Sequence, residues 1–338
     1  MRITLFPPQA VHELGRRANQ EDSIYPAQGD ATPDDRLFVL CDGMGGHERG
    51  EVASSAVCEG LADYFLHDVK ADEVLSDGQL QAALEHAYKF LDEKDNGEFR
   101  KAGTTMTLLC FHRGGCTAAH IGDSRIYHFR PSSREILYKS RDHSLVFELY
   151  QAGEITYREM KTHPRKNQIS RAMIAGRDNR QRMDVVHIAD IQPGDYFLIC
   201  SDGVLEHIDD EELMDWLVAD DDDNSKRLRL VEMTKRSADN HSAYLVHVAN
   251  VQAEAGDETL ADDEQTVRFN AVHIHPVLKA EDDVRIVPEE NDEVEATQLG
   301  DLPAVETEGG QKRRAVWWIV GALCALVTII ILLLTFIL

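Results

Sequence analysis

The stretch LFVLCDGMGGHERG, Leu37–Gly50, ends an apolar run at one aspartate and follows it with closely spaced glycines. The run Leu37–Leu40 is typical of a strand buried on both faces, although a buried helical segment has the same local pattern. Glycine permits positive φ and lets the backbone approach another group closely. Asp42 needs a partner at the end of such a strand, because an isolated buried charge is costly. That partner is a metal ion or an arginine, unless Asp42 only caps the corner between a strand and a helix.

Acidic residues occupy the same kind of position elsewhere in the chain. The segments are GRRANQEDSIY with Glu21 and Asp22, AAHIGDSRIYHFR with Asp123, DYFLICSDGVLEHI with Asp202, and KRSADNHSAYLVHV with Asp239. Strand ends of packed sheets can converge on one cleft, where carboxylates repel one another strongly unless cations lie between them. Oxygen ligands favour Mg²⁺ or Mn²⁺ over zinc, so the sequence predicts a site for hard divalent cations.

Length and composition limit the other possibilities. The chain has 338 residues, of which 43% are hydrophobic, and this is enough for one large domain or two small ones. The formal net charge of −25 argues against nucleic-acid binding, which normally needs a basic surface. The six cysteines form no CxxC pair, so no zinc or disulfide framework is predicted. Cys41, Cys110 and Cys200 lie in apolar runs and are expected to be buried thiols in a reducing compartment.

The segment Ala315–Leu338, AVWWIVGALCALVTIIILLLTFIL, carries no charged residue. It is long enough to cross a hydrocarbon core of roughly 30 Å. The basic run 312–314 precedes it, which predicts that everything N-terminal to the span stays in the cytoplasm. The N-terminal MRITLFPPQAVHELG has no long apolar core and is not a signal peptide. We therefore expect a single-pass C-terminal membrane anchor with the preceding domain on the cytoplasmic side.

These patterns divide the chain into a folded domain over 1–250, an acidic linker over 251–311, and a basic flank with a transmembrane helix over 312–338. The linker contains GDETLADDEQ and AEDDVRIVPEENDEVEATQLGD. Low hydrophobicity with one sign of charge cannot sustain a core, so the linker is expected to be disordered. Thr266 and Thr297 stand in acidic surroundings there. They are candidates for phosphorylation, followed by docking of a phosphothreonine reader or by dephosphorylation in cis.

Several segments between about residues 10 and 249 carry a specific resemblance. They are RRANQED, DGMGGH, AGTTMTLLC, IGDSRIYHF, DHSLVFELYQAGEI, HPRKNQISRAM, SDGVLEHI and ADNHSAYLV, in this order. A lone DGxxG is a weak signal, but with all of these motifs the chain resembles metal-dependent protein phosphatases of the PP2C (PPM) family, bacterial branch. The resemblance implies an α+β fold, an α-β-β-α sandwich of two packed antiparallel sheets flanked by helices. Helical patterns over Glu51–Phe65 and Leu80–Glu93 agree with it.

The resemblance assigns metal-binding roles to the acidic residues. Asp42 would bridge two metal ions, and the carbonyl of Gly43 would bind one of them, which would require the backbone to come close to an ion. Asp202 and Asp239 would complete the first site. Asp123 matches the aspartate that holds a third, weaker ion in bacterial relatives. The implied cofactor is Mg²⁺ or Mn²⁺, with two core ions.

The remaining roles concern the second ion, the phosphate and the leaving group. Glu21 or Asp22 would contact the second ion, directly or through water. Arg17 matches the arginine that grips the substrate phosphate, and arginine suits this because its planar fork donates two hydrogen bonds to phosphate oxygens. Eukaryotic members carry a histidine after the DG pair that is thought to act as general acid, and here Met44 occupies that position. His47 could protonate the leaving group, but it reads equally well as a surface residue and is left out of the catalytic set.

The implied activity is hydrolysis of phosphoserine and phosphothreonine in proteins by water activated between two cations. Phosphorylated proteins are then the substrates, and a Ser/Thr kinase is the natural counterpart. The alternative is a pseudophosphatase that recognises phosphoproteins at a membrane, as a binding or scaffold protein, without hydrolysing them. Asp42, Asp202 and Asp239 are all present, which favours the enzyme.

The segment Asp142–Arg177 resembles the flap beside the active site of bacterial relatives. Its polar candidates are His143, His163, Arg165 and Arg171. Arg165 is the candidate for positioning a phosphopeptide, and the alternative is a solvated loop. The histidines that flank strands show no metal-ligand spacing, and no metal role is expected for His112, His120 and His128.

Overall fold

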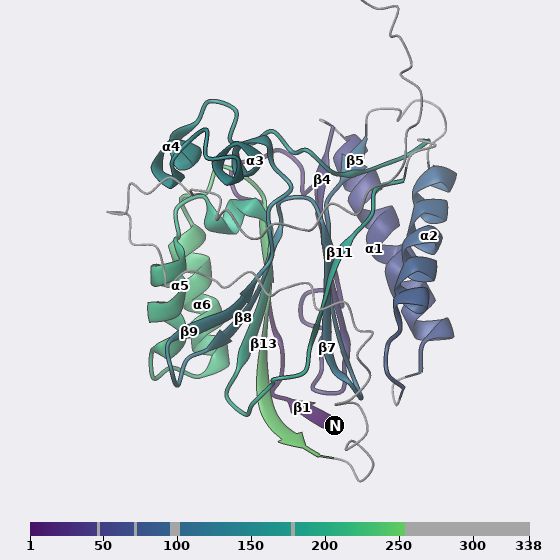
Figure 1. The fold of residues 1–338 in the computed structure, drawn as a ribbon, viewed down its shortest axis with the longest axis vertical. Coiled ribbons are helices and arrows are strands. Elements are labelled where there is room, and N and C mark those ends of the chain that lie inside the picture. The colour runs from purple at the N-terminus through teal and green to yellow at the C-terminus, as the bar shows by residue number, and fades with distance from the viewer. Residues whose placement is uncertain (46–47, 71–72, 95–101, 177–179, 254–338) are drawn as a thin grey trace, which may run out of the picture. The chain divides into compact units, whose positions relative to one another are not determined.

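The computed structural model describes residues 1–45, 48–70, 73–94, 102–176 and 180–253 (Figure 1). The chain divides into two units, Met1–Pro288 and Glu289–Leu338, and every described residue belongs to the first. Within these ranges, no helix has the length and apolar character needed to cross a membrane. The predicted anchor over 312–338 and nearly all of the predicted linker lie outside the described residues.

The first sheet has six strands, and all of its pairings are antiparallel. In spatial order they are β1 (Arg2–Leu5), β13 (His241–Gln252), β12 (Tyr196–Cys200), β8 (Arg125–Arg130) and β9 (Glu135–Lys139), with β2 (Gln9–Glu13) also paired to β13. The long strand β13 therefore joins the N-terminal strands to the rest of the sheet, because both β1 and β2 pair with it.

The second sheet has seven strands and is also antiparallel. In spatial order they are β10 (Met173–Ile174), β5 (Gly103–Thr104), β4 (Leu37–Met44), β6 (Met106–His112), β7 (Gly115–Ile121) and β11 (Asp184–Ile188), with β3 (Asp22–Tyr25) also paired to β4. The apolar run Leu37–Leu40 and the aspartate that follows it, Asp42, thus lie in an interior strand of this sheet.

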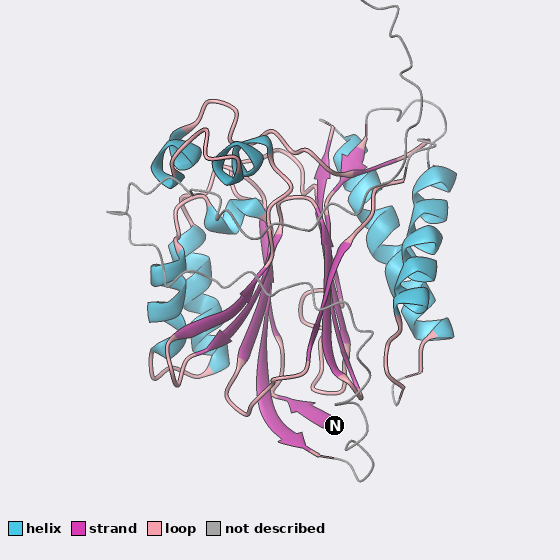
Figure 2. Ribbon diagram, in the orientation of Figure 1, coloured by secondary structure: helices cyan, strands magenta, loops and turns pink. Residues whose placement is uncertain are grey.

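Helices cover the outer face of each sheet, so that the described part has four layers (Figure 2). The helices α1 (Glu48–Asp68) and α2 (Asp77–Lys94) pack on the seven-stranded sheet through a shared apolar core. The helices α5 (Asp210–Val218) and α6 (Asp223–Thr234) pack in the same way on the six-stranded sheet. Both helical patterns predicted from the sequence lie inside α1 and α2.

Side chains along β4 alternate between two cores, as the period of two in a strand requires. Val39 and Cys41 face the core under α1 and α2. Phe38 and Leu40 face the core between the two sheets. In that central core Phe111 lies edge-on to Phe197, with ring centroids 5.2 Å apart. A strand buried on both faces must be apolar throughout, which explains the continuous apolar run in the sequence.

The predicted α-β-β-α sandwich of two antiparallel sheets is confirmed. The predicted flap contains α3 (Leu145–Gln151), α4 (Tyr157–Thr162) and the short strand β10. The helix α3 ends just before Gly153, whose φ is +70°. The cysteines Cys41, Cys110 and Cys200 are buried free thiols, in agreement with the prediction.

Candidate metal centre

The site begins where β3 pairs with the end of β4. Asp22 lies directly opposite Asp42 in this antiparallel pair. Like charges directly opposite each other destabilise a sheet, so both carboxylates are held at this position against their mutual repulsion.

Asp22 is the most enclosed acid of the site, with 3% of its surface exposed. Its Oδ2 accepts a hydrogen bond of 2.9 Å from Ser201 Oγ, whereas its Oδ1 is buried without a hydrogen-bond partner. Burial, together with the charges of Asp202 and Asp239, raises the pKa of Asp22 to about 7, although hydrogen bonds from serine side chains act to lower it. A buried lone pair with no donor is a ready ligand for a cation.

Asp42 is fixed through its backbone by the AGTT motif. Its N–H donates to Thr105 Oγ1 at 2.9 Å, and its carbonyl accepts from Thr104 Oγ1 at 2.9 Å and from the Thr105 N–H at 2.8 Å. Burial raises the pKa of the Asp42 carboxyl well above its usual range, and the charges of Asp22 and Asp202 add to this. These hydrogen bonds hold the carboxylate where other acids oppose its ionisation.

Asp202 begins a short 3₁₀ turn after β12, and Asp239 lies just before β13. Burial and the neighbouring charge of Asp239 raise the pKa of Asp202 to about 6. Asp239 Oδ2 accepts a hydrogen bond of 2.6 Å from Arg17 Nη2, and Asp239 Oδ1 accepts from the Asn240 N–H at 2.9 Å. The side chain of Arg17 remains 55% exposed, so Arg17 contacts an acid of the site and the solvent at the same time.

Asp123 follows β7 and joins the same group of acids. It is 8% exposed, and its Oδ1 is buried without a hydrogen-bond partner. Burial raises its pKa well above the usual range, with Asp202 and Asp142 as the charges that add most to the shift. The structure therefore brings together Asp22, Asp42, Asp123, Asp202 and Asp239, which the sequence spreads over more than half of the described chain.

Close backbone packing at the site explains two of its glycines. A Cβ on Gly43 would lie 2.2 Å from the carbonyl oxygen of Gly50 and 2.6 Å from that of Glu21. A Cβ on Gly203 would lie 2.0 Å from the carbonyl oxygen of Asn240. Close packing of the backbone within the chain is therefore enough to require glycine at both positions. The sequence analysis had assigned Gly43 only a contact with a metal ion. The carboxyl group of Glu21 lies against Gly50, at the first turn of α1.

Asn240 is a positioning residue that the sequence analysis did not identify. Its Nδ2 donates to the carbonyls of Leu14 and Asn19, and its Oδ1 accepts from the Glu21 N–H. Asn240 directly follows Asp239, so these hydrogen bonds hold the loop that carries Arg17 beside Asp239. A second clamp is Glu206, whose Oε2 accepts from Ser237 Oγ at 2.9 Å and from the Ala238 N–H at 2.8 Å.

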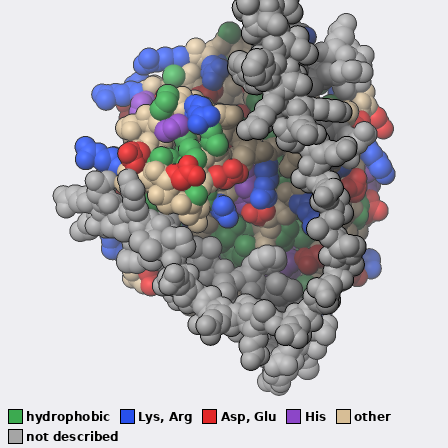
Figure 3. Space-filling view, turned by 45° about the horizontal axis from the view of Figure 1, so that its top comes forward, with side chains coloured by type: hydrophobic (Ala, Val, Ile, Leu, Met, Phe, Trp, Pro, Cys, Tyr) green, Lys and Arg blue, Asp and Glu red, His purple; other side chains and the backbone are tan. Residues whose placement is uncertain are grey.

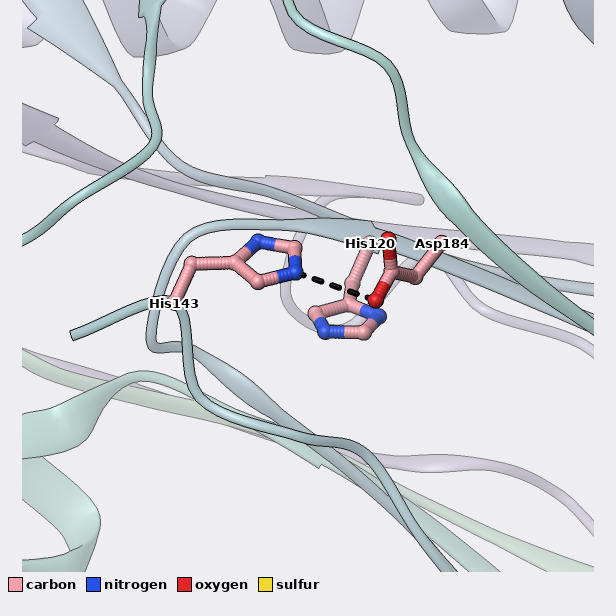
Figure 4. Close-up of side chains that lie close together, drawn as sticks. All are labelled: His120, His143 and Asp184. Atoms are coloured by element: carbon pink, nitrogen blue, oxygen red, sulfur yellow. Dashed lines mark hydrogen bonds and ion pairs between the residues drawn. The ribbon is translucent and has the colours of Figure 1, made fainter. Parts of the chain in front are cut away.

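A separate cluster lies where the flap meets the seven-stranded sheet (Figure 4). His120 of β7, His143 and Asp184 of β11 offer ligand atoms that lie within 4.8 Å of one another. The His143 Nε2 lies 3.2 Å from Asp184 Oδ2, and the two imidazole rings stack with centroids 4.7 Å apart. The sequence analysis gave His120 no metal-ligand pattern, because these residues are far apart in the chain.

The donors and acceptors of this cluster form a hydrogen-bonded network. The Gly122 N–H donates to His143 Nδ1 at 3.0 Å, so the neutral His143 carries its proton on Nε2 and donates it to Asp184. Asp184 also accepts from Arg171 Nη1 at 2.9 Å. The stacked rings have nearly parallel planes, so their in-plane lone pairs do not meet at one ion. The network fastens the flap to β11.

The five-aspartate site fits hard divalent cations better. Its donors are carboxylate oxygens and backbone carbonyls, which Mg²⁺ and Mn²⁺ prefer. Two buried carboxylate oxygens, on Asp22 and Asp123, have no hydrogen-bond partner. Burial together with neighbouring negative charge raises the pKa of Asp42 and Asp202, which is the pattern expected of carboxylates placed to bind a cation.

Comparison with known proteins identifies relatives of this chain. The family described as Protein phosphatase 2C matches residues 13–221. Serine/threonine protein phosphatase PstP of Mycobacterium tuberculosis is 32% identical over 222 residues, which cover 65% of this chain and 40% of PstP. A putative protein phosphatase 2C-type of Streptococcus pyogenes is 30% identical over 236 residues, which cover 69% of this chain and 93% of that protein. The matched part thus spans less than half of PstP but most of the streptococcal protein.

Solved structures agree with this result. The PPM Ser-Thr phosphatase MsPP of Mycobacterium smegmatis, in complex with cacodylate, superimposes with a TM-score of 0.60 at 28% identity, covering 73% of this chain and 100% of MsPP. The catalytic domain of PstP in complex with two manganese ions superimposes with a TM-score of 0.59 at 28% identity, covering 74% of this chain and 100% of that domain. From its fold, its clustered aspartates and these matches, the chain belongs to the protein phosphatase 2C family.

Proposed function

We propose that this protein hydrolyses phosphoserine and phosphothreonine in other proteins, with Mg²⁺ or Mn²⁺ as cofactor. The observation that carries the proposal is the convergence of five aspartates, two of them with buried, unpartnered oxygens, in a protein phosphatase 2C fold. The named phosphatases among its relatives and the two manganese ions bound to the PstP catalytic domain support it.

The cations would be held by Asp42, Asp202 and Asp239 together with the carbonyl of Gly43, and Asp22 and Asp123 supply further oxygens. When bound, such ions lower the pKa of water and stabilise charge on a phosphoryl group. The chain's own contribution is a rigid set of ligands. Thr104 and Thr105 fix Asp42, Ser201 donates a hydrogen bond to Asp22, and the Glu21 N–H donates one to Asn240.

Arg17 would bind the substrate phosphate. Its Nη2 already donates to Asp239, so the guanidinium is oriented at the edge of the site, and its exposed N–H groups remain for phosphate oxygens. Burial around the aspartates limits water near the reacting group, while the exposed Arg17 leaves a way in for a phosphorylated side chain.

Arg17→Ala is expected to lower kcat/KM for a phosphothreonine peptide by about 10- to 100-fold, because a charge-assisted hydrogen bond contributes roughly 1.5–3 kcal/mol. Arg17→Lys should recover only part of this loss, since a lysine cannot donate two parallel hydrogen bonds. Steady-state kinetics at saturating Mn²⁺ would measure both. Equal kcat/KM for wild type and Arg17→Ala would show that Arg17 does not bind the phosphate.

Release of inorganic phosphate from a phosphothreonine peptide by the full chain, in a mild detergent, tests the central proposal. Release is expected with Mn²⁺ and should stop when a chelator is in excess. Binding of the peptide without release at saturating Mn²⁺ would instead favour the pseudophosphatase that the sequence left as the alternative.

We also propose that the segment 315–338 holds the phosphatase domain at the cytoplasmic face of a membrane, where it opposes a Ser/Thr kinase. An uncharged apolar run preceded by a basic flank supports the tether. Deletion of 312–338 is expected to move the protein from the membrane fraction to the supernatant while its phosphatase activity is retained. Recovery of both forms in the supernatant would refute the tether.

A further inference from the structure

The flap carries a concentration of positive charge that is unusual for this chain. The full sequence has a formal net charge of −25, yet the segment Tyr157–Arg171 contains five basic residues and one acidic residue. Figure 3 shows Lys and Arg side chains gathered at the upper left of that view. We call the side chains of Arg158, Lys161, Arg165 and Lys166 the basic flap surface; all four residues are exposed.

Within the described part of the chain, Arg158, Arg165 and Lys166 take part in no ion pair. Several basic residues elsewhere do form ion pairs, as Arg134 does with Asp215 at 2.6 Å. The fourth member of the surface, Lys161, lies 5.1 Å from the centroid of the Tyr157 ring and keeps its charge in solvent. This surface therefore offers several cations that form no ion pair with the acidic residues of the described ranges.

Figure 1 shows the flap helices α3 and α4 at the same end of the molecule as the end of β4, which carries Asp42, and the start of β13, which follows Asp239. Burial acts to raise the pKa of Glu206, but hydrogen bonds from Ala238 and Ser237 lower it below its usual value. The positive charge of Lys166 contributes to this lowering. Glu206 in turn holds the two residues before Asp239, the partner of Arg17. The loop Ser237–Asp239, which Glu206 holds in place, thus lies between Lys166 and Arg17, the proposed phosphate-binding residue.

The flap is held in place by several hydrogen bonds, so its charges have a defined position. The Leu145 N–H donates to the carbonyl of Gln168 at 2.9 Å, and the Ser170 N–H donates to that of His143 at 2.8 Å. A capping box formed by Thr156 and Glu159 begins α4. Charges fixed before the ligand arrives bind it at a lower cost in conformational entropy.

We propose that the basic flap surface binds acidic side chains that flank the phosphorylated residue, so that the preferred substrates are phosphothreonine or phosphoserine segments rich in Asp and Glu. This inference rests on the proposed phosphatase activity. An extended peptide advances roughly 3.3–3.6 Å per residue, so acids a few positions from the phosphate would pass the flap while the phosphate contacts Arg17. Without this surface, a chain of net charge −25 would repel such a substrate.

Two matched phosphopeptides test the proposal. The chain itself contains a suitable acidic sequence, ADDEQTVRF around Thr266, in which Asp262, Asp263 and Glu264 precede the threonine. One synthetic peptide carries this sequence phosphorylated on the threonine, and the other carries lysine at the three acidic positions. p-Nitrophenyl phosphate, which has no flanking residues, reports the activity of the metal centre alone.

The full-chain wild type is expected to hydrolyse the acidic peptide with a kcat/KM about tenfold above that for the lysine peptide, mainly through KM, because several weak exposed ion pairs add up. The preference should shrink as NaCl is raised. The triple variant Arg158→Glu, Arg165→Glu, Lys166→Glu should lose or reverse this preference while it still hydrolyses p-nitrophenyl phosphate. A control with the same change in net charge, Lys70→Glu, Lys89→Glu, Arg229→Glu, alters exposed residues on or beside the outer helices and should keep it.

The possible outcomes distinguish a failure of the basic flap surface from a failure of the proposed phosphatase activity. Hydrolysis of p-nitrophenyl phosphate with no preference between the peptides would overturn the basic flap surface and leave the phosphatase intact. An equal preference in wild type and the flap variant would also overturn it. No hydrolysis of p-nitrophenyl phosphate by the wild type at saturating Mn²⁺ would overturn the proposed activity itself.

Discussion

Asp42→Asn is expected to remove Mn²⁺-dependent phosphate release, with a loss of about 100-fold or more in kcat. Even residues that only orient metal ligands typically change activity by about 10- to 100-fold, and Asp42 is proposed to bind two ions. The backbone of residue 42 should stay in place, because Thr104 and Thr105 hold its N–H and carbonyl and neither contact involves the carboxylate. Release of phosphate from a phosphothreonine peptide, measured at saturating Mn²⁺, gives the result directly.

The same substitution should stabilise the metal-free protein at neutral pH. Burial raises the pKa of the Asp42 carboxyl, and Asp22, Asp202, Asp123 and Asp239 all oppose its ionisation. Asparagine has nearly the same shape and no charge, so it removes this repulsion. An inactive variant with a melting temperature above that of the wild type in chelator would therefore show that the acids are placed for a cation at the expense of stability.

The control is Asp68→Asn, which removes one negative charge from the exposed end of α1. It should change neither activity nor melting temperature appreciably, because isolated surface charges contribute little. Full activity in Asp42→Asn would refute the assigned metal centre. A lower melting temperature in chelator would mean that Asp42 is held mainly by contacts within the protein.

Much of the site could be predicted from the sequence because its acids stand at strand ends. A strand buried on both faces needs a continuous apolar run, and the polar residue that ends such a run lies at the edge of the sheet. Asp42, Asp202 and Asp239 carry this local signal, and each reaches the common site. The fold itself came from the order of the motifs, since strand periodicity alone does not specify how two sheets pair.

The contacts that fix the acids could not be predicted, because they join residues far apart in the chain. Asn240 contacts Leu14 and Asn19 across more than two hundred positions, and nothing near Asn240 in sequence indicates this. The sequence also left the choice between Glu21 and Asp22 open. The pairing of β3 with β4 places Asp22 opposite Asp42, whereas the carboxyl group of Glu21 lies against Gly50.

The His120–His143–Asp184 cluster shows the same limit. Its members come from β7, the start of the flap and β11, so no motif spacing connects them. The pairing of β11 with β7 brings Asp184 opposite His120, and His143 stacks on His120 from the start of the flap. Long-range pairing of this kind is a property of topology and leaves no periodic trace in the local sequence.

Mn²⁺ is expected to raise the melting temperature of the full chain by about 5–10 °C near pH 8 and by much less near pH 5. Burial raises the pKa of Asp22 to about 7 and that of Asp202 to about 6, well above the ordinary aspartate value. Between pH of about 4 and 7 the folded, metal-free state retains protons that the unfolded chain has released, so its stability falls as the pH rises through this window. A bound cation replaces those protons, and its advantage is therefore greatest where both carboxyls would otherwise be ionised.

Thermal unfolding in excess chelator and in saturating Mn²⁺, at matched ionic strength and across this pH range, measures the effect. Asp239→Asn provides the control, because it removes one proposed ligand and should reduce the Mn²⁺-induced shift at every pH. A shift that is equal at both ends of the range would mean that the cation does not bind at the carboxyls whose pKa is raised. A shift that survives in Asp239→Asn at full size would place the bound ion away from Asp239, and the five-aspartate centre would no longer account for metal binding by this protein.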